Sequence, residues 1–352
     1  MKTLRKLPAG ELLDFRRELT EAPLAFPQPS AIVYYETNQF YPEANTMRIC
    51  FNISADSFYG IFYPCKEPTD SGMILMLGDS CSDTMVRAAV RWFNDRGCHV
   101  MALSQDKLDP SLHSFPLERI GRVIEILHAK GARRIGFFGM SATAQIALTS
   151  AIRFPEISLT IALSPNDYIL EGYLRRDGRE LPADGESVLT WEGKPLPYLP
   201  YVWRGKDYWE NPRQYARQTR NLVASKTLFD LSEQAHPMTE LERIPVEKIS
   251  GRLILAGARD DCMWDTCKYM ERMQKVLAGT PGEEKATFLY YDHGTHFLFP
   301  QTMLNRMLPI CPGLLPRAAF RAAREFPNEC RQTRLDLDET LTAAIKSWQQ
   351  RA

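Results

Sequence analysis

The sequence lacks the cysteine patterns that mark metal-binding and disulfide-rich proteins. Its eight cysteines are scattered singly along 352 residues, with no C-x-x-C pair and no histidine at the spacing of a zinc site. We therefore predict no metal site and no cofactor. A reduced, cytoplasmic protein is the simplest interpretation, although secretion with disulfides is not excluded.

An excess of charge of one sign and a long apolar run are also lacking. Lys and Arg balance Asp and Glu at 43 each, so the chain has no basic field for nucleic acid or anionic membranes. The basic N-terminus is followed by a proline, acids and arginines instead of an apolar run, so we expect neither a signal peptide nor a membrane span. The chain is long enough to bury a sizeable core.

What the sequence does contain is an alternation of strand-like and helix-like segments. After two strand-like runs at 47–53 and 57–63, continuous apolar runs typical of strands buried on both faces occur at 72–77, 97–103, 134–138, 159–163, 252–256 and 287–291. Amphipathic helical patterns occupy 85–95, 117–130, 141–154, 264–277 and 337–349. This order predicts an α/β fold with a doubly wound, mostly parallel sheet.

One long segment interrupts the alternation. Residues from about 165 to 246 are rich in proline and aromatic side chains, among them Tyr198, Tyr201 and Trp203. A structureless loop of that length is improbable inside a compact domain, so we predict a cap or lid insertion. The alternative is a surface excursion with a small core of its own. A second excursion, at 300–328, precedes the terminal helix and is expected to pack beside it.

The stretch from Arg134 to Ala144 carries the first sign of chemistry. A short apolar run reaches Gly139, then Ser141, and a helical pattern begins at once, which is the context that a nucleophile elbow requires. The usual signature is G-x-S-x-G, and Thr143 stands at its last position. Taken alone, the serine is explained equally well as a helix N-cap.

Partners for the serine follow two later strands. In a doubly wound hydrolase the order is serine, acid, histidine, each on a loop after a strand. Asp260 and Asp261 follow the run at 252–256, and His293 and His296 follow the run at 287–291. Adjacent aspartates diverge, so only one can face a histidine. Each residue alone could be a helix cap or a loop residue, but three such loops at one sheet edge favour a catalytic triad.

These residues and their surroundings resemble the acyl-CoA thioesterase/bile acid-CoA:amino acid N-acyltransferase family of α/β-hydrolases. The resemblance covers about 72–349 and includes the blocks 171–178 and 244–249, the Asp-Asp-x-x-Trp loop and the second histidine loop. The resemblance implies an α/β-hydrolase fold with Ser141 as nucleophile, Asp261 as acid and His296 as base. From the order of elements we expect the hydrolase domain over 31–352, preceded by an N-terminal helical extension over 1–30 with an amphipathic helix at about 11–21.

Two departures from the family pattern raise further expectations. Family thioesterases carry an N-terminal β-sandwich of over a hundred residues, and only about seventy residues precede Gly72 here, so we expect the sandwich to be absent. Thr143 replaces the elbow glycine, so the turn should open or the threonine should point into the site. The acyltransferase branch of the family uses cysteine, and a serine resembles the hydrolytic branch.

The expected function is hydrolysis of an ester or thioester, such as an acyl-CoA, through an acyl-enzyme. Backbone N–H groups of Ala142 and Asp79 would form the oxyanion hole. Substrate-binding residues are expected in the elbow, the loop after the strand at 72–77, and the cap: Ser80, Cys81, Met140, Tyr198, Tyr201 and Trp203. In the cap, Arg175 and Arg176 would meet a phosphate-bearing leaving group, or remain solvated surface residues.

Three alternatives remain open at this point. The same triad would serve a carboxylesterase or a peptidase, and an amine or alcohol acceptor would turn the hydrolase into an acyltransferase. The chain could also be a non-catalytic binding protein that keeps the fold. The expected partner is a small acyl ester or thioester, and the sequence does not distinguish a monomer from a homo-oligomer.

Overall fold

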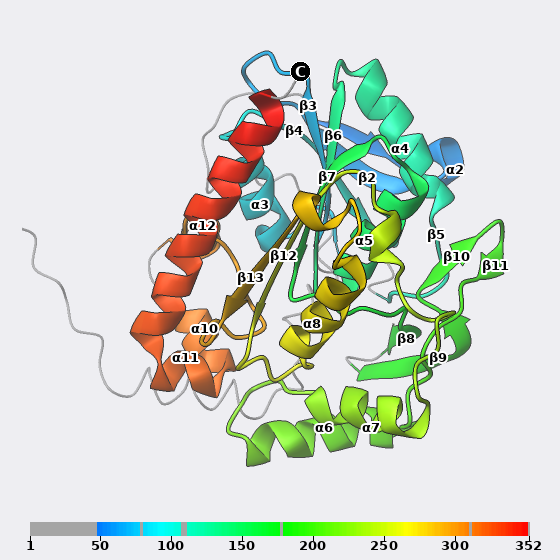
Figure 1. Ribbon diagram of the computed structural model, residues 1–352, viewed down its shortest axis with the longest axis vertical. Coiled ribbons are helices and arrows are strands. Elements are labelled where there is room, and N and C mark those ends of the chain that lie inside the picture. Colours follow the sequence, from blue (N-terminus) through cyan, green and yellow to red (C-terminus); the bar gives the residue numbers. More distant parts are fainter. Residues whose placement is uncertain (1–47, 78–79, 107–110, 177–178, 310–311, 351–352) are drawn as a thin grey trace, which may run out of the picture.

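An eight-stranded sheet lies at the centre of the fold (Figure 1). The computed structural model describes residues 48–77, 80–106, 111–176, 179–309 and 312–350. The predicted extension over 1–30, with its helix at about 11–21, lies outside these residues. The strands, in spatial order, are β1 (Ile49–Phe51), β2 (Tyr59–Tyr63), β4 (His99–Ser104), β3 (Ser71–Met76), β6 (Arg134–Met140), β7 (Ile157–Leu163), β12 (Arg252–Ala258) and β13 (Ala286–Tyr291).

Most of the sheet is parallel. The two strands at one edge, β1 and β2, pair in antiparallel fashion, and β2 is antiparallel to β4. From β4 through β3, β6, β7 and β12 to β13, every neighbouring pair is parallel. The carboxyl ends of these six strands therefore meet at one edge of the sheet.

Helices cover both faces of the sheet. Side chains of β3 alternate between the two sides: Ile74 and Met76 belong to one apolar cluster, and Met73 and Leu75 to the other. The first cluster includes side chains of α4 (Glu118–Ala129), α5 (Ala144–Arg153) and α8 (Thr266–Leu277). The second includes side chains of α3 (Thr84–Asn94), α9 (Gln301–Met307) and α12 (Pro327–Gln350). The predicted doubly wound, mostly parallel sheet is confirmed.

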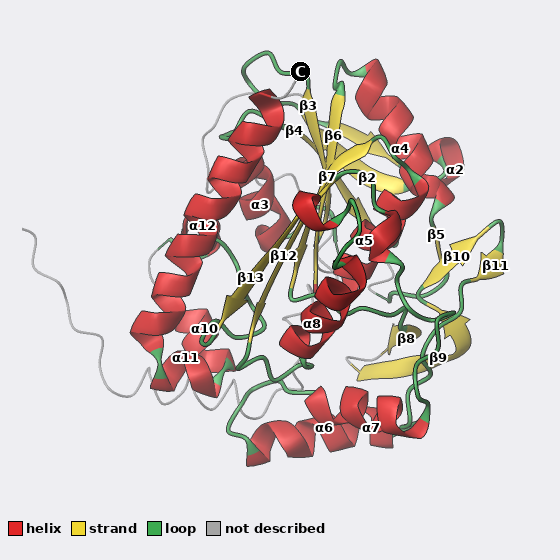
Figure 2. Ribbon diagram, in the orientation of Figure 1, coloured by secondary structure: helices red, strands yellow, loops and turns green. Residues whose placement is uncertain are grey.

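The segment between β7 and β12, here called the cap (residues 165–246), has secondary structure of its own. Figure 2 shows its helices as red ribbons beyond the arrowhead of β13, on the carboxyl side of the parallel strands. Its elements are β8 (Glu171–Arg176), β9 (Arg179–Ser187), β10 (Leu189–Trp191), β11 (Lys194–Pro195), α6 (Asp207–Gln218) and α7 (Lys226–Ala235). Strand β10 also pairs with β5 (Phe115–Pro116), which ties the cap to the loop before α4.

Two of the differences from the expected boundaries have a local structural reason. The strand expected to reach Ile53 ends at Phe51, because Asn52 caps a one-turn helix, α2 (Ile53–Asp56), by accepting a hydrogen bond from Ala55 N. The last helix begins at Pro327, ten residues earlier than the pattern predicted, with a proline at its first position. The excursion before it forms α9, α10 (Leu314–Ala319) and α11 (Arg321–Glu325).

One buried carboxylate joins α12 to the second face of the sheet. Asp338 Oδ1 accepts hydrogen bonds from Trp92 Nε1 at 3.1 Å and Arg96 Nη2 at 2.9 Å, both on or just after α3. Its Oδ2 accepts from the backbone N–H of Thr302 on α9 at 2.6 Å. Three segments that are distant in sequence therefore depend on one side chain.

Replacing this carboxylate should destabilise the fold. We expect Asp338→Ala to lower the free energy of unfolding by about 2–3 kcal/mol, because the charged Arg96 and the Thr302 N–H lose an acceptor, whereas Trp92 Nε1 still donates to Thr302 Oγ1. Urea denaturation followed by circular dichroism measures the change. Glu339→Ala is the matched control, since Glu339 is exposed on the same helix. Equal stability of the two variants would contradict this role for Asp338.

Candidate active site

The turn after β6 holds Ser141 in a conformation that L-residues seldom adopt. Its φ is 57°, between the end of β6 and the 3₁₀ turn Ser141–Thr143 that leads into α5. A non-glycine residue in this region costs on the order of 1–3 kcal/mol and persists only where its surroundings enforce it. A strained serine between a strand and a helix is the geometry of a nucleophile elbow.

Gly139 and Thr143 explain how the turn closes. A Cβ at position 139 would lie 2.6 Å from Thr143 O, so only glycine fits there. The Thr143 hydroxyl donates to Met76 O at 2.6 Å, at the end of β3, and accepts from Met140 N at 3.1 Å. The threonine hydroxyl therefore joins the elbow to the neighbouring strand. It does not point into the site, which was one of the two expectations from the sequence.

Ser141, His296 and Asp261 lie in one chain of hydrogen bonds. His296 Nε2 is 2.7 Å from Ser141 Oγ, and His296 Nδ1 is 2.8 Å from Asp261 Oδ2. The His296 and Asp261 side chains are 2% and 1% exposed, while Ser141 is half-buried. The three loops follow β6, β12 and β13, whose carboxyl ends share one edge of the sheet. A base shielded from water and a reachable serine suit nucleophilic chemistry.

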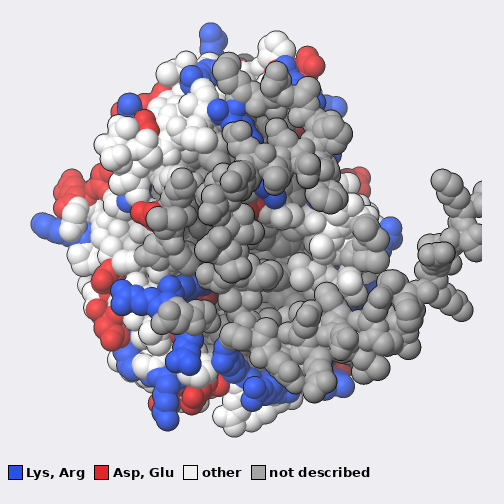
Figure 3. Space-filling model, turned by 180° about the vertical axis from the view of Figure 1, so that it is seen from behind, with Lys and Arg blue, Asp and Glu red and all other residues white. Residues whose placement is uncertain are grey.

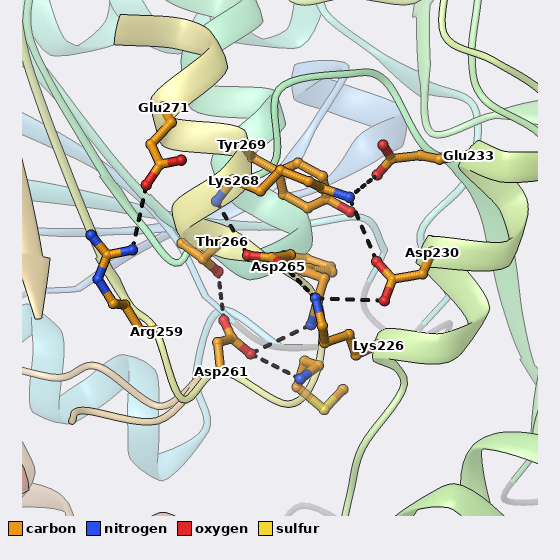
Figure 4. Close-up of polar contacts among 12 residues, drawn as sticks. Lys226, Asp230, Glu233, Arg259, Asp261, Asp265, Thr266, Lys268, Tyr269 and Glu271 are labelled. Carbon is orange, nitrogen blue, oxygen red and sulfur yellow. Dashed lines mark hydrogen bonds and ion pairs between the residues drawn. The ribbon is translucent and has the colours of Figure 1, made fainter. Parts of the chain in front are cut away.

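The Asp261 carboxylate is oriented by its own loop. Oδ1 accepts from Met263 N at 2.8 Å and Trp264 N at 3.4 Å, and Oδ2 accepts from Thr266 Oγ1 at 2.5 Å (Figure 4). Thr266 opens α8, so the first turn of that helix fixes the carboxylate. These donors, together with the histidine, leave the buried charge well compensated.

Asp260 and His293, the alternatives from the sequence, form a separate pair. His293 Nδ1 is 3.2 Å from Asp260 Oδ2, and the His293 ring stacks on Phe326 with centroids 3.8 Å apart. Asp260 Oδ1 accepts from the N–H groups of Gly294 and Thr295, which closes the histidine loop. Burial raises the pKa of the Asp260 carboxyl above its ordinary value, while these hydrogen bonds act in the opposite direction.

The other expected site residues occupy varied positions. Asp79 lies outside the described residues, and Ala142 follows the serine in the 3₁₀ turn. Cys81 is fully buried, and burial raises the pKa of its thiol. The remaining residues are buried or half-buried: Ser80, Met140, Tyr198, Tyr201 and Trp203. Their contact with substrate stays a prediction.

Tyr201 is buried among aromatic side chains of the cap that continue the apolar cluster on the first face of the sheet. Its ring packs against Tyr208, with centroids 5.2 Å apart, and against Phe229 at 5.9 Å. The tyrosine is 3% exposed, and its backbone N–H donates to the buried Glu171 carboxylate. These cap side chains belong to the same apolar cluster as those of α5 and α8, so the described residues do not show a separate core at Tyr201. Whether the segment acts as a lid stays a prediction.

The site also contains side chains that sequence reasoning did not select. Trp264 stands edge-on to the His296 ring, with centroids 5.0 Å apart and an interplanar angle of 89°. Ser164, at the end of β7, donates from Oγ to His296 O at 2.8 Å and adopts a φ of 45°. The Asp-Asp-x-x-Trp pattern could have indicated the tryptophan. The sequence around Ser164 indicated only a turn at the end of a strand.

The sheet order, together with the placement of Ser141, Asp261 and His296, is that of an α/β-hydrolase. The family described as BAAT / Acyl-CoA thioester hydrolase C terminal matches residues 125–303, just over half of the chain. The chain belongs to this family.

Solved esterase structures are similar at low identity. The esterase domain of a Rhodothermus marinus protein is 12% identical, with a TM-score of 0.44, 84% of this chain covered and 98% of that chain. An esterase from Pyrococcus furiosus is 12% identical, with a TM-score of 0.43 and coverages of 87% and 100%. At these scores the likeness bears on neither substrate nor mechanism. No curated protein matches the chain.

Two further observations concern the environment of the protein. Among the described residues, no helix combines the length and the apolar character needed to cross a bilayer. The cysteines of the described ranges are free thiols: Cys50, Cys65, Cys81, Cys98, Cys262, Cys267 and Cys330. The cytoplasmic location expected from the sequence stays a prediction.

The Thr143 hydroxyl should matter more than its methyl group. We expect Thr143→Val to lower the free energy of unfolding by about 1–2 kcal/mol, because the buried Met76 carbonyl and Met140 N–H lose a partner. Thr149→Val is the matched control: Thr149 is also buried, on α5, and its hydroxyl has no hydrogen-bond partner among the described residues. That variant should be neutral or slightly stabilised. Chemical denaturation of both variants tests this, and equal losses would refute this role for the Thr143 hydroxyl.

Proposed function

We propose that this protein is a serine hydrolase that cleaves an ester or thioester through an acyl-enzyme. The observation that carries the proposal is the continuous chain from Ser141 Oγ through the His296 ring to Asp261 Oδ2, with distances of 2.7 and 2.8 Å. Membership of a family described by its acyl-CoA thioester hydrolases supports the same reaction class. The carboxylate, the histidine and the strained serine each have the surroundings that this chemistry needs.

In the proposed mechanism His296 transfers one proton in each half of the reaction. Nε2 takes the proton of the Ser141 hydroxyl as the oxygen attacks the acyl carbonyl, and returns it to the departing alcohol or thiol. The carbon–leaving-group bond breaks, leaving the acyl group on Ser141. Water then gives a proton to His296 and attacks the acyl carbon, and Ser141 recovers its proton as the acid leaves. Asp261 keeps the imidazole in the required orientation and balances its transient positive charge.

Negative charge on the carbonyl oxygen requires donors. We propose that the backbone N–H of Ala142, in the 3₁₀ turn before α5, and that of Asp79, after β3, form the oxyanion hole. The position of Ala142 directly after the serine supports its role, because the residue after the nucleophile supplies this donor in α/β-hydrolases. One such donor contributes about 3 kcal/mol to transition-state stabilisation.

Two properties of the chain favour a thioester with an anionic leaving group, such as an acyl-CoA. The family is described by its acyl-CoA thioester hydrolases. The cap also carries a basic cluster, in which the guanidinium groups of Arg179 and Arg213 lie 4.8 and 4.7 Å from the Trp209 ring. In the reverse view of Figure 3, several Lys and Arg side chains, with Asp and Glu side chains among them, lie at the lower left, the side on which β8 and β9 lie. Arg175, by contrast, is already paired with Glu180.

Variants of the three site residues test the mechanism. We expect Ser141→Ala, His296→Gln and Asp261→Asn each to lower kcat for a p-nitrophenyl ester or acyl-CoA by about 10⁴-fold. Asp260→Asn and His293→Gln are matched controls from the same loops. They should lose on the order of tenfold or less, because they affect only loop position. Wild-type turnover by Ser141→Ala would end the proposal, and a deeper loss in either control would reverse the choice of acid or base.

A substrate panel tests the leaving group. With one acyl chain, we expect kcat/KM to be higher for the CoA thioester than for the p-nitrophenyl ester or the anilide. Arg179→Gln and Arg213→Gln should each raise KM two- to fivefold, or about 0.5–1 kcal/mol, for the CoA substrate alone. Arg122→Gln, on the exposed side of α4, is the control. Equal KM changes for all substrates would refute the anionic site, and an acceptor-dependent product would show acyl transfer.

A further inference from the structure

The cap helix α7 is joined to the core helix α8 by a ladder of ion pairs. Positions 226, 230 and 233 of α7 face positions 265, 268 and 272 at the start of α8, and Figure 4 shows part of this ladder beside the Asp261 loop. The N–O distances are 2.5 Å for Lys226–Asp265, 3.1 Å for Lys268–Glu233 and 2.9 Å for Arg272–Glu233. The spacing places these side chains on one face of α7.

The same face of α7 also brings an aromatic ring toward the histidine. Phe229 is 6% exposed, and its ring stands edge-on to Trp264 with centroids 5.0 Å apart and an interplanar angle of 88°. Trp264 in turn stands edge-on to His296 at 5.0 Å. Edge-to-face rings at this separation attract each other beyond the area that they bury. An aromatic column therefore runs from the cap to the proposed base.

Trp264 and Ser164 also restrain the backbone of the histidine. The Trp264 indole N–H donates to Ser164 O at 3.2 Å, and the Ser164 hydroxyl donates to His296 O at 2.8 Å. The backbone N–H of Trp264 lies 3.4 Å from the Asp261 carboxylate. Trp264 thus contacts the ring of His296 and is linked to the His296 backbone through Ser164. Its own backbone N–H also approaches Asp261.

We propose that Trp264 is a positioning residue for His296, and that the cap in turn fixes the position of Trp264 through Phe229. The inference rests on the proposed function. His296 must reach first the serine and then the leaving group, and a misplacement of about 1 Å can cost 100-fold in rate. The cap therefore contributes to the rate of the chemical step as well as to any contact with substrate.

The test compares four variants. We expect Trp264→Leu and Phe229→Ala to lower kcat about tenfold or more with KM changed less than twofold. Trp264→Phe keeps a ring in the column but lacks the indole N–H, so it should recover part of the loss. Leu189→Ala is the matched control, because Leu189 is fully buried in cap strand β10 and is no member of the ring column. It should lose stability with kcat unchanged.

A second readout does not depend on turnover. In ¹H–¹⁵N spectra the imidazole signals of His296, assigned by their loss in His296→Gln, should broaden or split in Trp264→Leu and Phe229→Ala, and stay sharp in Leu189→Ala. Unchanged signals, or wild-type kcat in Trp264→Leu while Ser141→Ala is inactive, would overturn the positioning role alone. Wild-type turnover by Ser141→Ala would instead overturn the proposed function. Equal kcat losses in all three non-conservative variants would show a general effect of stability.

Discussion

The close approach of backbone at the end of β6 is the constraint on which the site depends. Gly139 lets the chain reverse so tightly that a Cβ would lie 2.6 Å from Thr143 O, and Ser141 takes a positive φ as a result. Such strain must be held by the surroundings. The Thr143 hydroxyl meets part of that need by joining the elbow to the end of β3. The replacement of the usual glycine is therefore compatible with the elbow, because the side chain points toward the neighbouring strand.

A strained serine is useful only if its partners arrive at the same edge. Parallel pairing from β6 through β7 and β12 to β13 guarantees this, since each loop leaves its strand on the same side. The first turn of α8 then orients Asp261 through Thr266 and the loop N–H groups. The geometry of the site thus follows from ordinary α/β architecture together with one tight turn and the first turn of α8.

The strand order and the loops that form the site could largely be predicted from the sequence, for a physical reason. Strands buried on both faces give continuous apolar runs, and the loops that follow them must meet, so Ser141, the aspartate pair and the two histidines could be found from order alone. The choices of Asp261 over Asp260 and of His296 over His293 came only from family resemblance, because both members of each pair lie in the same predicted loop. The direction of Thr143 and the burial of Tyr201 depend on neighbours distant in sequence. The N-terminal half of α12 was missed because its mostly polar residues gave no apolar stripe.

The cap is attached to the core more firmly than a freely opening lid would be. Asp167, at the start of the cap and 2% exposed, binds Arg272 of α8 through two hydrogen bonds of 2.6 Å. Burial raises the pKa of the Asp167 carboxyl, and the Arg272 guanidinium opposes that shift. Separating the two would leave a buried charge uncompensated, which costs several kcal/mol. Motion that admits substrate is therefore expected in other parts of the cap, while α7 and α8 stay together beside the Asp261 loop. Because α7 stays attached to α8, Phe229 can keep the aromatic column in place while other parts of the cap move. Substrate entry and histidine placement can therefore change independently.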